Sequence, residues 1–97
     1  MEKKVLDLPL KAKWYDMIES GEKTEEYREI KPYWETRFID MEGLPSYTHY
    51  DEVKFRYGYT KRTMTFECLG IEQGFGKPEW GAPNEEVFII KLGKRIK

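Results

Sequence analysis

The chain contains one cysteine and one histidine, which removes several classes of site. With Cys68 alone, no internal disulfide bond can form and no cysteine-based metal site is expected; Cys68 itself fits a core position. The acidic residues are scattered and show no metal-ligand spacing, so we expect neither a metal nor a cofactor. A catalytic site of the Ser-His-Asp or Cys-His type would have to use His49, which falls in an expected loop at residues 42–49.

Long apolar runs and a sizeable net charge are also lacking. No segment approaches the ~20 apolar residues that a membrane-spanning helix needs. Residues 1–4 precede only a short apolar run, so we expect no signal peptide. A formal net charge of −1 creates no global field that would draw the chain to nucleic acid or to an anionic membrane. The expectation is a cytoplasmic protein that does not bind membranes.

What the chain does have is aromatic and charged side chains in one domain-sized length. Its 97 residues are 15% aromatic and 36% charged, which predicts a single domain over residues 1–97 with a modest core. The charges are unevenly placed, because acids gather in residues 16–42 while residues 54–62 carry four basic side chains and no acid.

The first half predicts two helices and two strands. Leu10, Trp14, Met17 and Ile18 recur at helical spacing and Gly21 follows, which predicts a helix over residues 11–20. The other expected elements are a strand over 5–8 closed by Pro9, a strand over 24–30 and a short helix after Pro32. Trp14, Trp34 and Phe38 are most simply explained as core residues of these helices.

The second half predicts mainly strands. Alternation of apolar and polar residues over 53–59 and again over 63–68 indicates a hairpin, and residues 87–92 form a final buried strand. Four glycines and two prolines predict a long loop over 70–84, where Trp80 either fixes the loop or stacks on a ligand. The whole is an α+β chain, mainly β, and five or six strands with two helices near the N-terminus favour a small, partly closed β-barrel.

The stretch Gly21-Glu22-Lys23-Thr24-Glu25-Glu26-Tyr27-Arg28 is the strongest functional signal. Glu26 and Arg28 are two residues apart, so on a strand they point to the same face. Lys23 enters from the turn after the helix, where strand parity need not hold. We therefore expect all three side chains in one cleft, with Glu26 and Arg28 buried and in contact; the simpler alternative is a strand with solvated charges.

These residues resemble the ASCH (activating signal cointegrator homology) domain family. The likeness is carried by Leu8-Pro9-Leu10-Lys11, by the helix around Trp14-Tyr15-Asp16-Met17-Ile18, by Gly21-x-Lys23-x-x-Glu26-x-Arg28, and by Phe55-Arg56-Tyr57-Gly58-Tyr59 and Phe88-Ile89-Ile90-Lys91-Leu92-Gly93. The resemblance implies a PUA-like β-barrel whose cleft binds RNA or a nucleotide-like ligand. It gives Lys23, Glu26 and Arg28 as ligand-binding residues, with Arg56 and Tyr57 as candidate neighbours.

The resemblance also implies an alternative activity. Some small bacterial members are amidohydrolases that remove an acetyl group from the exocyclic amine of a modified cytidine. In those members a threonine stands three residues after the lysine, where this chain has Glu26. A carboxylate close to Lys23 favours its charged form, which works against a neutral lysine base and favours binding over hydrolysis.

The sequence leaves hydrolysis and a third function open. Catalysis would use Lys23 and Glu26, with Glu26 itself able to transfer the proton, and with Thr24, Glu72 or Glu79 as further available groups. The basic and aromatic residues of 54–62 are also compatible with a surface that follows a phosphate backbone and stacks bases. Of its aromatics, Phe55 fits the core, and Tyr57 and Tyr59 can face either way. The third reading is a protein-interaction module with an incidental charged cleft.

Overall fold

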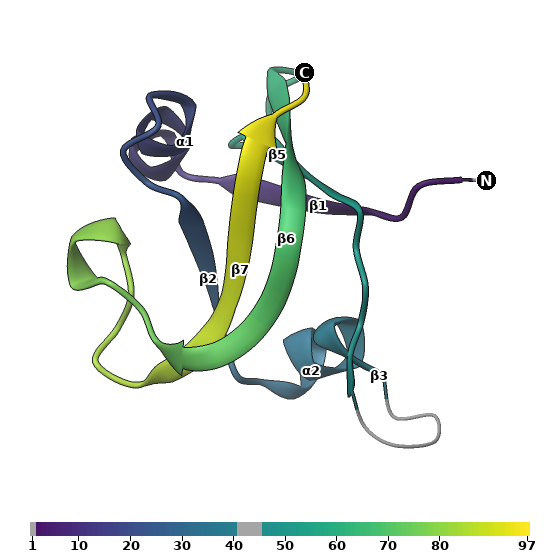
Figure 1. Cartoon of the computed structure of the whole chain (residues 1–97). Helices are drawn as coiled ribbons and strands as arrows, with labels where there is room; N and C mark the ends of the chain where they lie inside the picture. The colour runs from purple at the N-terminus through teal and green to yellow at the C-terminus, as the bar shows by residue number, and fades with distance from the viewer. Residues whose placement is uncertain (1, 41–45) are drawn as a thin grey trace.

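A five-stranded sheet curls into a half-barrel in a computed structural model that describes residues 2–40 and 46–97 (Figure 1). The strands follow the order β1-β5-β6-β7-β2, and a separate two-stranded sheet pairs β3 with β4. The elements are β1 (Val5–Leu10), α1 (Ala12–Glu19), β2 (Glu25–Glu29), α2 (Pro32–Phe38), β3 (Ile39–Asp40), β4 (Ser46–Tyr47), β5 (Glu52–Tyr57), β6 (Thr63–Phe75), a 3-10 helix (Pro78–Trp80) and β7 (Glu86–Arg95). The mixed α+β, mainly β fold with two helices near the N-terminus is confirmed.

The apolar faces of the strands meet inside the curl. The alternation in β5 buries Val53 and Phe55 completely, and its predicted hairpin partner β6 buries Met64 against them. From the helices, Ile18 and Phe38 fill the same core. Burial of these side chains provides the main driving force for the curl, because each removes apolar area from water.

The two open edges of the sheet, β1 and β2, approach each other. β1 pairs in parallel with β5 and β2 pairs antiparallel with β7, so within residues 2–40 and 46–97 each has one side without a strand partner. Arg28 on β2 crosses the gap, because its Nη2 donates to the carbonyl oxygen of Pro9 on β1 at 3.2 Å. A side chain, rather than a backbone ladder, thus links the edges where the barrel stays open.

Two sequence expectations were wrong at the strand ends. β1 does not stop before Pro9 but runs through it to Leu10; an edge strand tolerates proline because its missing N–H need not serve a ladder on the free side. Residues 70–75 are not loop, because β6 continues to Phe75 and stays paired with β7. Gly70, with a φ of 142°, lies at a shift in the β6–β7 register, and this irregularity is what the sequence pattern could not distinguish from a loop.

Two further sequence expectations, for residues 42–49 and for Cys68, differ from the structure. Ser46 and Tyr47, inside the expected 42–49 loop, pair with β3, while residues 42–45 lie outside the described residues. Cys68, expected in the core, is half-buried beside the same register shift and packs against the core from its margin. No helix in residues 2–40 and 46–97 is long and apolar enough to cross a membrane.

Candidate functional site

A cavity of about 660 Å³ opens where the two sheet edges meet the start of α1 and the loop before β7. This volume falls in the range of small-molecule sites in proteins. Its lining combines aromatic rings with charges of both signs: Pro9, Leu10, Lys11, Trp14, Glu26, Tyr27, Arg28, Glu29, Trp34, Trp80, Gly81, Pro83, Glu85 and Val87.

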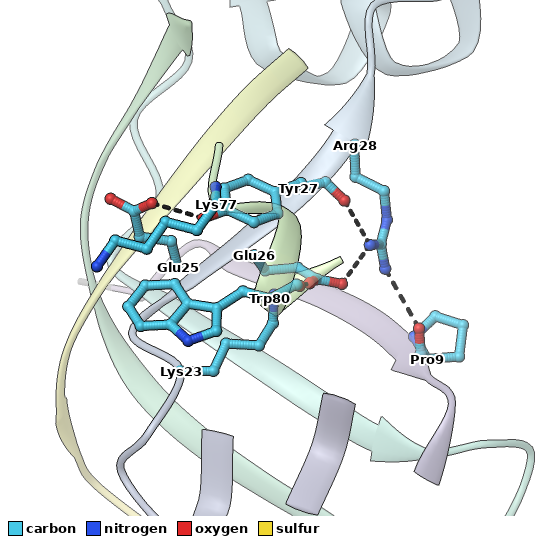
Figure 2. A network of polar contacts seen from close by, with 8 residues as sticks. All are labelled: Pro9, Lys23, Glu25, Glu26, Tyr27, Arg28, Lys77 and Trp80. Carbon is cyan, nitrogen blue, oxygen red and sulfur yellow. Dashed lines mark hydrogen bonds and ion pairs between the residues drawn. The ribbon is translucent and has the colours of Figure 1, made fainter. Parts of the chain in front are cut away.

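Glu26 is the polar centre of the cavity wall. One carboxylate oxygen, Oε1, lies 3.1 Å from Nζ of Lys23, and the other, Oε2, accepts from Nη1 of Arg28. Figure 2 shows Arg28 lying between this carboxylate, the Tyr27 carbonyl at 2.8 Å and the Pro9 carbonyl. Glu26 is buried and Arg28 is half-buried, so the expected contact between the two side chains is confirmed and the expected burial is complete only for Glu26.

Lys23 lies beneath the cavity rather than on its surface. Its side chain is 0% exposed, and Nζ donates to the carbonyl oxygen of Trp80 at 2.5 Å. The ammonium also sits over the rings of Tyr27 and Trp14, with its nitrogen 4.5 and 5.4 Å from their centroids. Lys23 therefore joins Glu26 to the loop before β7, and it does not line the cavity.

Burial lowers the pKa of Lys23, and the negative charge of Glu26 opposes this effect without cancelling it. From the sequence, the Glu26 carboxylate was expected to keep the Lys23 side chain charged. The structure reverses that balance, because complete removal of the ammonium from water outweighs its ion pair. The lysine is held in an environment that weakens its hold on the proton.

The loop of residues 76–85 forms one wall and is fixed against β2. Tyr27 uses its hydroxyl twice, donating to Glu25 Oε1 at 2.8 Å and accepting from the Lys77 backbone N–H at 3.0 Å. Burial raises the pKa of Tyr27, so this hydroxyl keeps its proton. Gly76 packs so closely on the ring that a Cβ there would lie 2.5 Å from a Tyr27 carbon. The wall is therefore built for close contact with β2.

All three tryptophans of the chain line the cavity. Trp14 and Trp34 were expected in the core, which is wrong for Trp14 and only partly right for Trp34, which lines the cavity while packing against the core. Arg28 lies over the Trp34 ring at 5.3 Å, and Trp14 contacts Gly81, whose φ of 99° and missing Cβ allow the approach. Trp80 both fixes its loop through its carbonyl and faces the cavity.

Arg56 and Tyr57 do not line this cavity. Arg56 reaches Asp7 at 3.6 Å on the outer face of the sheet, and the Tyr57 ring packs edge-on against Tyr15 with centroids 5.1 Å apart. The sequence pattern correctly predicted a strand with alternating aromatic residues, but it does not indicate which side of the sheet carries the cavity.

The remaining catalytic candidates also lie elsewhere. Thr24 is exposed, Glu72 pairs with Lys91 at 3.2 Å on the sheet surface, and Glu79 is exposed on the 3-10 helix. Glu29 and Glu85, in contrast, do line the cavity, and no pattern in the sequence marked them.

Metal ligation finds no support in the described part of the chain. Residues 2–40 and 46–97 contain no group of three histidine, cysteine, aspartate or glutamate side chains that could hold an ion. The exposed His49 lies 3.0 Å from Asp51 and away from the cavity lining.

No protein-family model, no curated protein and no solved structure matches the chain. The geometry of the cavity is therefore the basis for assigning a function.

Proposed function

We propose that the cavity binds the base of a nucleotide, either free or within RNA, with Glu26 and Arg28 as the polar contacts. The observation that carries the proposal is a carboxylate fixed by two cations in the wall of a cavity that contains three tryptophans. The resemblance to ASCH domains agrees with a ligand of this class.

Glu26 and Arg28 retain hydrogen-bonding capacity for a ligand. A carboxylate offers about four lone-pair positions, so its two ion-pair contacts leave acceptors for a base amine such as that of cytosine. The Arg28 guanidinium has five N–H donors, and its contacts with Glu26, Tyr27 and Pro9 do not use them all. The free donors suit a base carbonyl or a phosphate oxygen.

The aromatic side chains supply the apolar part of the site. Stacking of a base on an aromatic side chain contributes about 1–3 kcal/mol, and Trp14, Trp34 and Trp80 each bring a half-buried ring to the cavity wall. Lys23 acts in this proposal as a positioning residue, since its buried ammonium holds Glu26 and the Trp80 carbonyl together.

Calorimetric titration with cytidine and uridine monophosphates tests the proposal at low salt. We expect the cytidine nucleotide to bind about 5- to 150-fold tighter, because one good base contact is worth about 1–3 kcal/mol of discrimination. Glu26→Gln should remove that preference. Glu52→Gln is the matched control, since Glu52 is also buried and ion-paired, to Lys3 at 2.9 Å, but does not line the cavity.

Circular dichroism and thermal unfolding would show that both variants remain folded. If neither nucleotide binds the wild-type protein, or if Glu26→Gln binds both nucleotides as the wild type does, the proposal is wrong. The comparison between the two nucleotides needs no substitution and therefore stands even if a variant fails to fold.

A second candidate function is hydrolysis of an acylated cytidine, and one observation favours it. The pKa of Lys23 is lowered by burial beneath the cavity, which is the change that a general base requires, and Glu26, which lines the cavity, contacts its ammonium. Incubation of the wild-type protein with N4-acetylcytidine, followed by mass detection of cytidine and acetate, tests this candidate. Turnover that is lost in Lys23→Met but kept in Glu52→Gln would favour it, and no turnover by the wild type would reject it.

A further inference from the structure

The turn between β5 and β6 presents an exposed aromatic side chain on a well-braced backbone. Tyr59 is 97% exposed, the highest exposure of any large apolar or aromatic residue in the described chain. Thr60 holds the turn, with Oγ1 donating to the Tyr57 carbonyl at 2.7 Å and accepting from the Arg62 N–H at 3.2 Å. Arg56 Nη1 donates to the Thr60 carbonyl at 3.2 Å. The ring is therefore held out in solvent without packing of its own.

The turn that carries Tyr59 also presents basic side chains. Residues 53–66 contain no acid, and Lys61, two residues after Tyr59, is exposed. Two further exposed lysines, Lys11 and Lys13, lie at the start of α1. Within residues 2–40 and 46–97, these three lysines form no ion pair with an acidic side chain, in contrast to Arg56 and Arg62, which pair with Asp7 and Glu19. Their charges are thus available to an anionic partner.

This surface adjoins the rim of the cavity. Leu10 is the register partner of Tyr57, and its carbonyl accepts from the Gly58 N–H at 2.8 Å, which ties the turn to the end of β1. Leu10 and Lys11 both line the cavity. An extended ligand that leaves the cavity over Lys11 therefore reaches the turn directly.

We propose that Tyr59 and Lys61 form a second contact site, which stacks the base and binds the phosphate of a nucleotide adjacent to the one in the cavity. The chemistry on this surface, an exposed aromatic ring beside unpaired lysines, matches single-stranded nucleic acid, in which unstacked bases alternate with phosphates. The inference rests on the proposed function and narrows its ligand from a free nucleotide to a strand.

Fluorescence anisotropy with a labelled single-stranded RNA hexamer tests the second site. Tyr59→Ala should weaken hexamer binding about 10-fold, as expected for the loss of one stacked base, and Lys61→Gln should weaken it less and reduce its salt dependence. Calorimetric binding of cytidine monophosphate should stay unchanged in both variants. Tyr47→Ala is the control, since Tyr47 is an exposed tyrosine on β4, away from this turn and from the cavity lining.

The outcomes separate the two proposals. Hexamer affinity within 2-fold of wild type in Tyr59→Ala would overturn the second site and leave mononucleotide binding in the cavity intact. Weaker hexamer binding in Tyr59→Ala, together with no mononucleotide binding by the wild type or any variant, would support a contact site at Tyr59 and refute nucleotide binding in the cavity. A DNA hexamer of the same sequence distinguishes recognition of the 2′-hydroxyl from recognition of the shared phosphates and bases, and equal binding to duplex RNA would contradict stacking on unpaired bases.

Discussion

Glu26 and Lys23 form a buried ion pair, and removal of either side chain leaves the charge of the other without its partner. Glu26→Gln leaves the Lys23 ammonium buried without its carboxylate, so we expect the free energy of unfolding to fall by about 3 kcal/mol. The double variant Lys23→Met/Glu26→Gln should lose less than Glu26→Gln alone, because the fully buried ammonium is then removed with its partner and only the half-buried Arg28 loses its carboxylate. Urea denaturation measures both.

Glu29 supplies the control on the same strand. Its ion pair with Lys31, at 3.0 Å, is exposed on both sides, and Glu29→Gln should change stability by less than about 1 kcal/mol. Strictly additive losses in the Lys23 and Glu26 variants would contradict the coupling between them.

Titration of Lys23 should appear in the pH dependence of stability. Its pKa in the folded protein lies below the ordinary value of 10.5, so between these two values the unfolded chain binds a proton that the native protein does not. The free energy of unfolding contributed by Lys23 therefore rises with pH in that window. We expect the stability of wild type relative to Lys23→Met to increase as the pH rises toward 10.5. Parallel urea-denaturation curves for the two proteins across this range would show that the lysine keeps an ordinary pKa.

The loop of residues 76–85 depends on Gly76 for its packing, and Gly74, just before the loop on β6, provides the comparison. Gly76→Ala would place a methyl group 2.5 Å from the Tyr27 ring and 2.8 Å from Ala82, so the loop must shift. We expect a loss of about 1–3 kcal/mol and faster amide exchange in the loop. Gly74→Ala, two residues earlier on β6, meets only Ile89 at an ordinary 3.5 Å and should be nearly neutral. Equal effects of the two substitutions on melting temperature would contradict this packing.

Elements with a clear period were predictable from the sequence, and those with an irregular backbone were not. Helical spacing around Trp14 and Ile18 located α1 to within a residue or two, and alternation around Phe55 located β5. The extension of β6 past Gly70 was hidden because its register shift breaks the alternation. The end of β1 was predicted wrongly at Pro9 for a related reason. Whether proline ends a strand depends on whether that strand lies at an edge, which is a property of the sheet and not of the segment.

At the scale of the whole molecule, the site was predictable only where its residues are close in sequence. Glu26 and Arg28 share a face of one strand, and their contact followed from parity alone. The rest of the cavity comes from Pro9 at one sheet edge and from Trp80 and Glu85 in the loop before β7, which meet only because the sheet curls. Strand order and curvature are set by tertiary packing, so the side of the sheet that carries the cavity, and with it the positions of Arg56 and Tyr57, lay beyond sequence reasoning.

Binding of a strand to a molecule with a net charge of −1 should depend on a few local cations. If Lys11, Lys13 and Lys61 each neutralise one phosphate, the affinity for single-stranded RNA should fall about 20-fold between 50 and 200 mM salt, following a slope of about −0.7 per phosphate on logarithmic axes. Anisotropy titrations at four salt concentrations give the slope. A salt-independent affinity would mean that phosphates contribute nothing to binding.

The gathering of Trp14, Trp34 and Trp80 around one cavity gives the protein a built-in optical reporter. Because the chain has no other tryptophan, its emission on excitation near 295 nm arises entirely from indoles in the cavity wall. A base that stacks on any of them would quench this emission without a label, whereas a ligand that bound only at the Tyr59 turn would leave it largely unchanged. The intrinsic fluorescence of the unmodified protein therefore reports occupancy of the cavity in particular, and it can be followed on the millisecond scale of stopped-flow mixing.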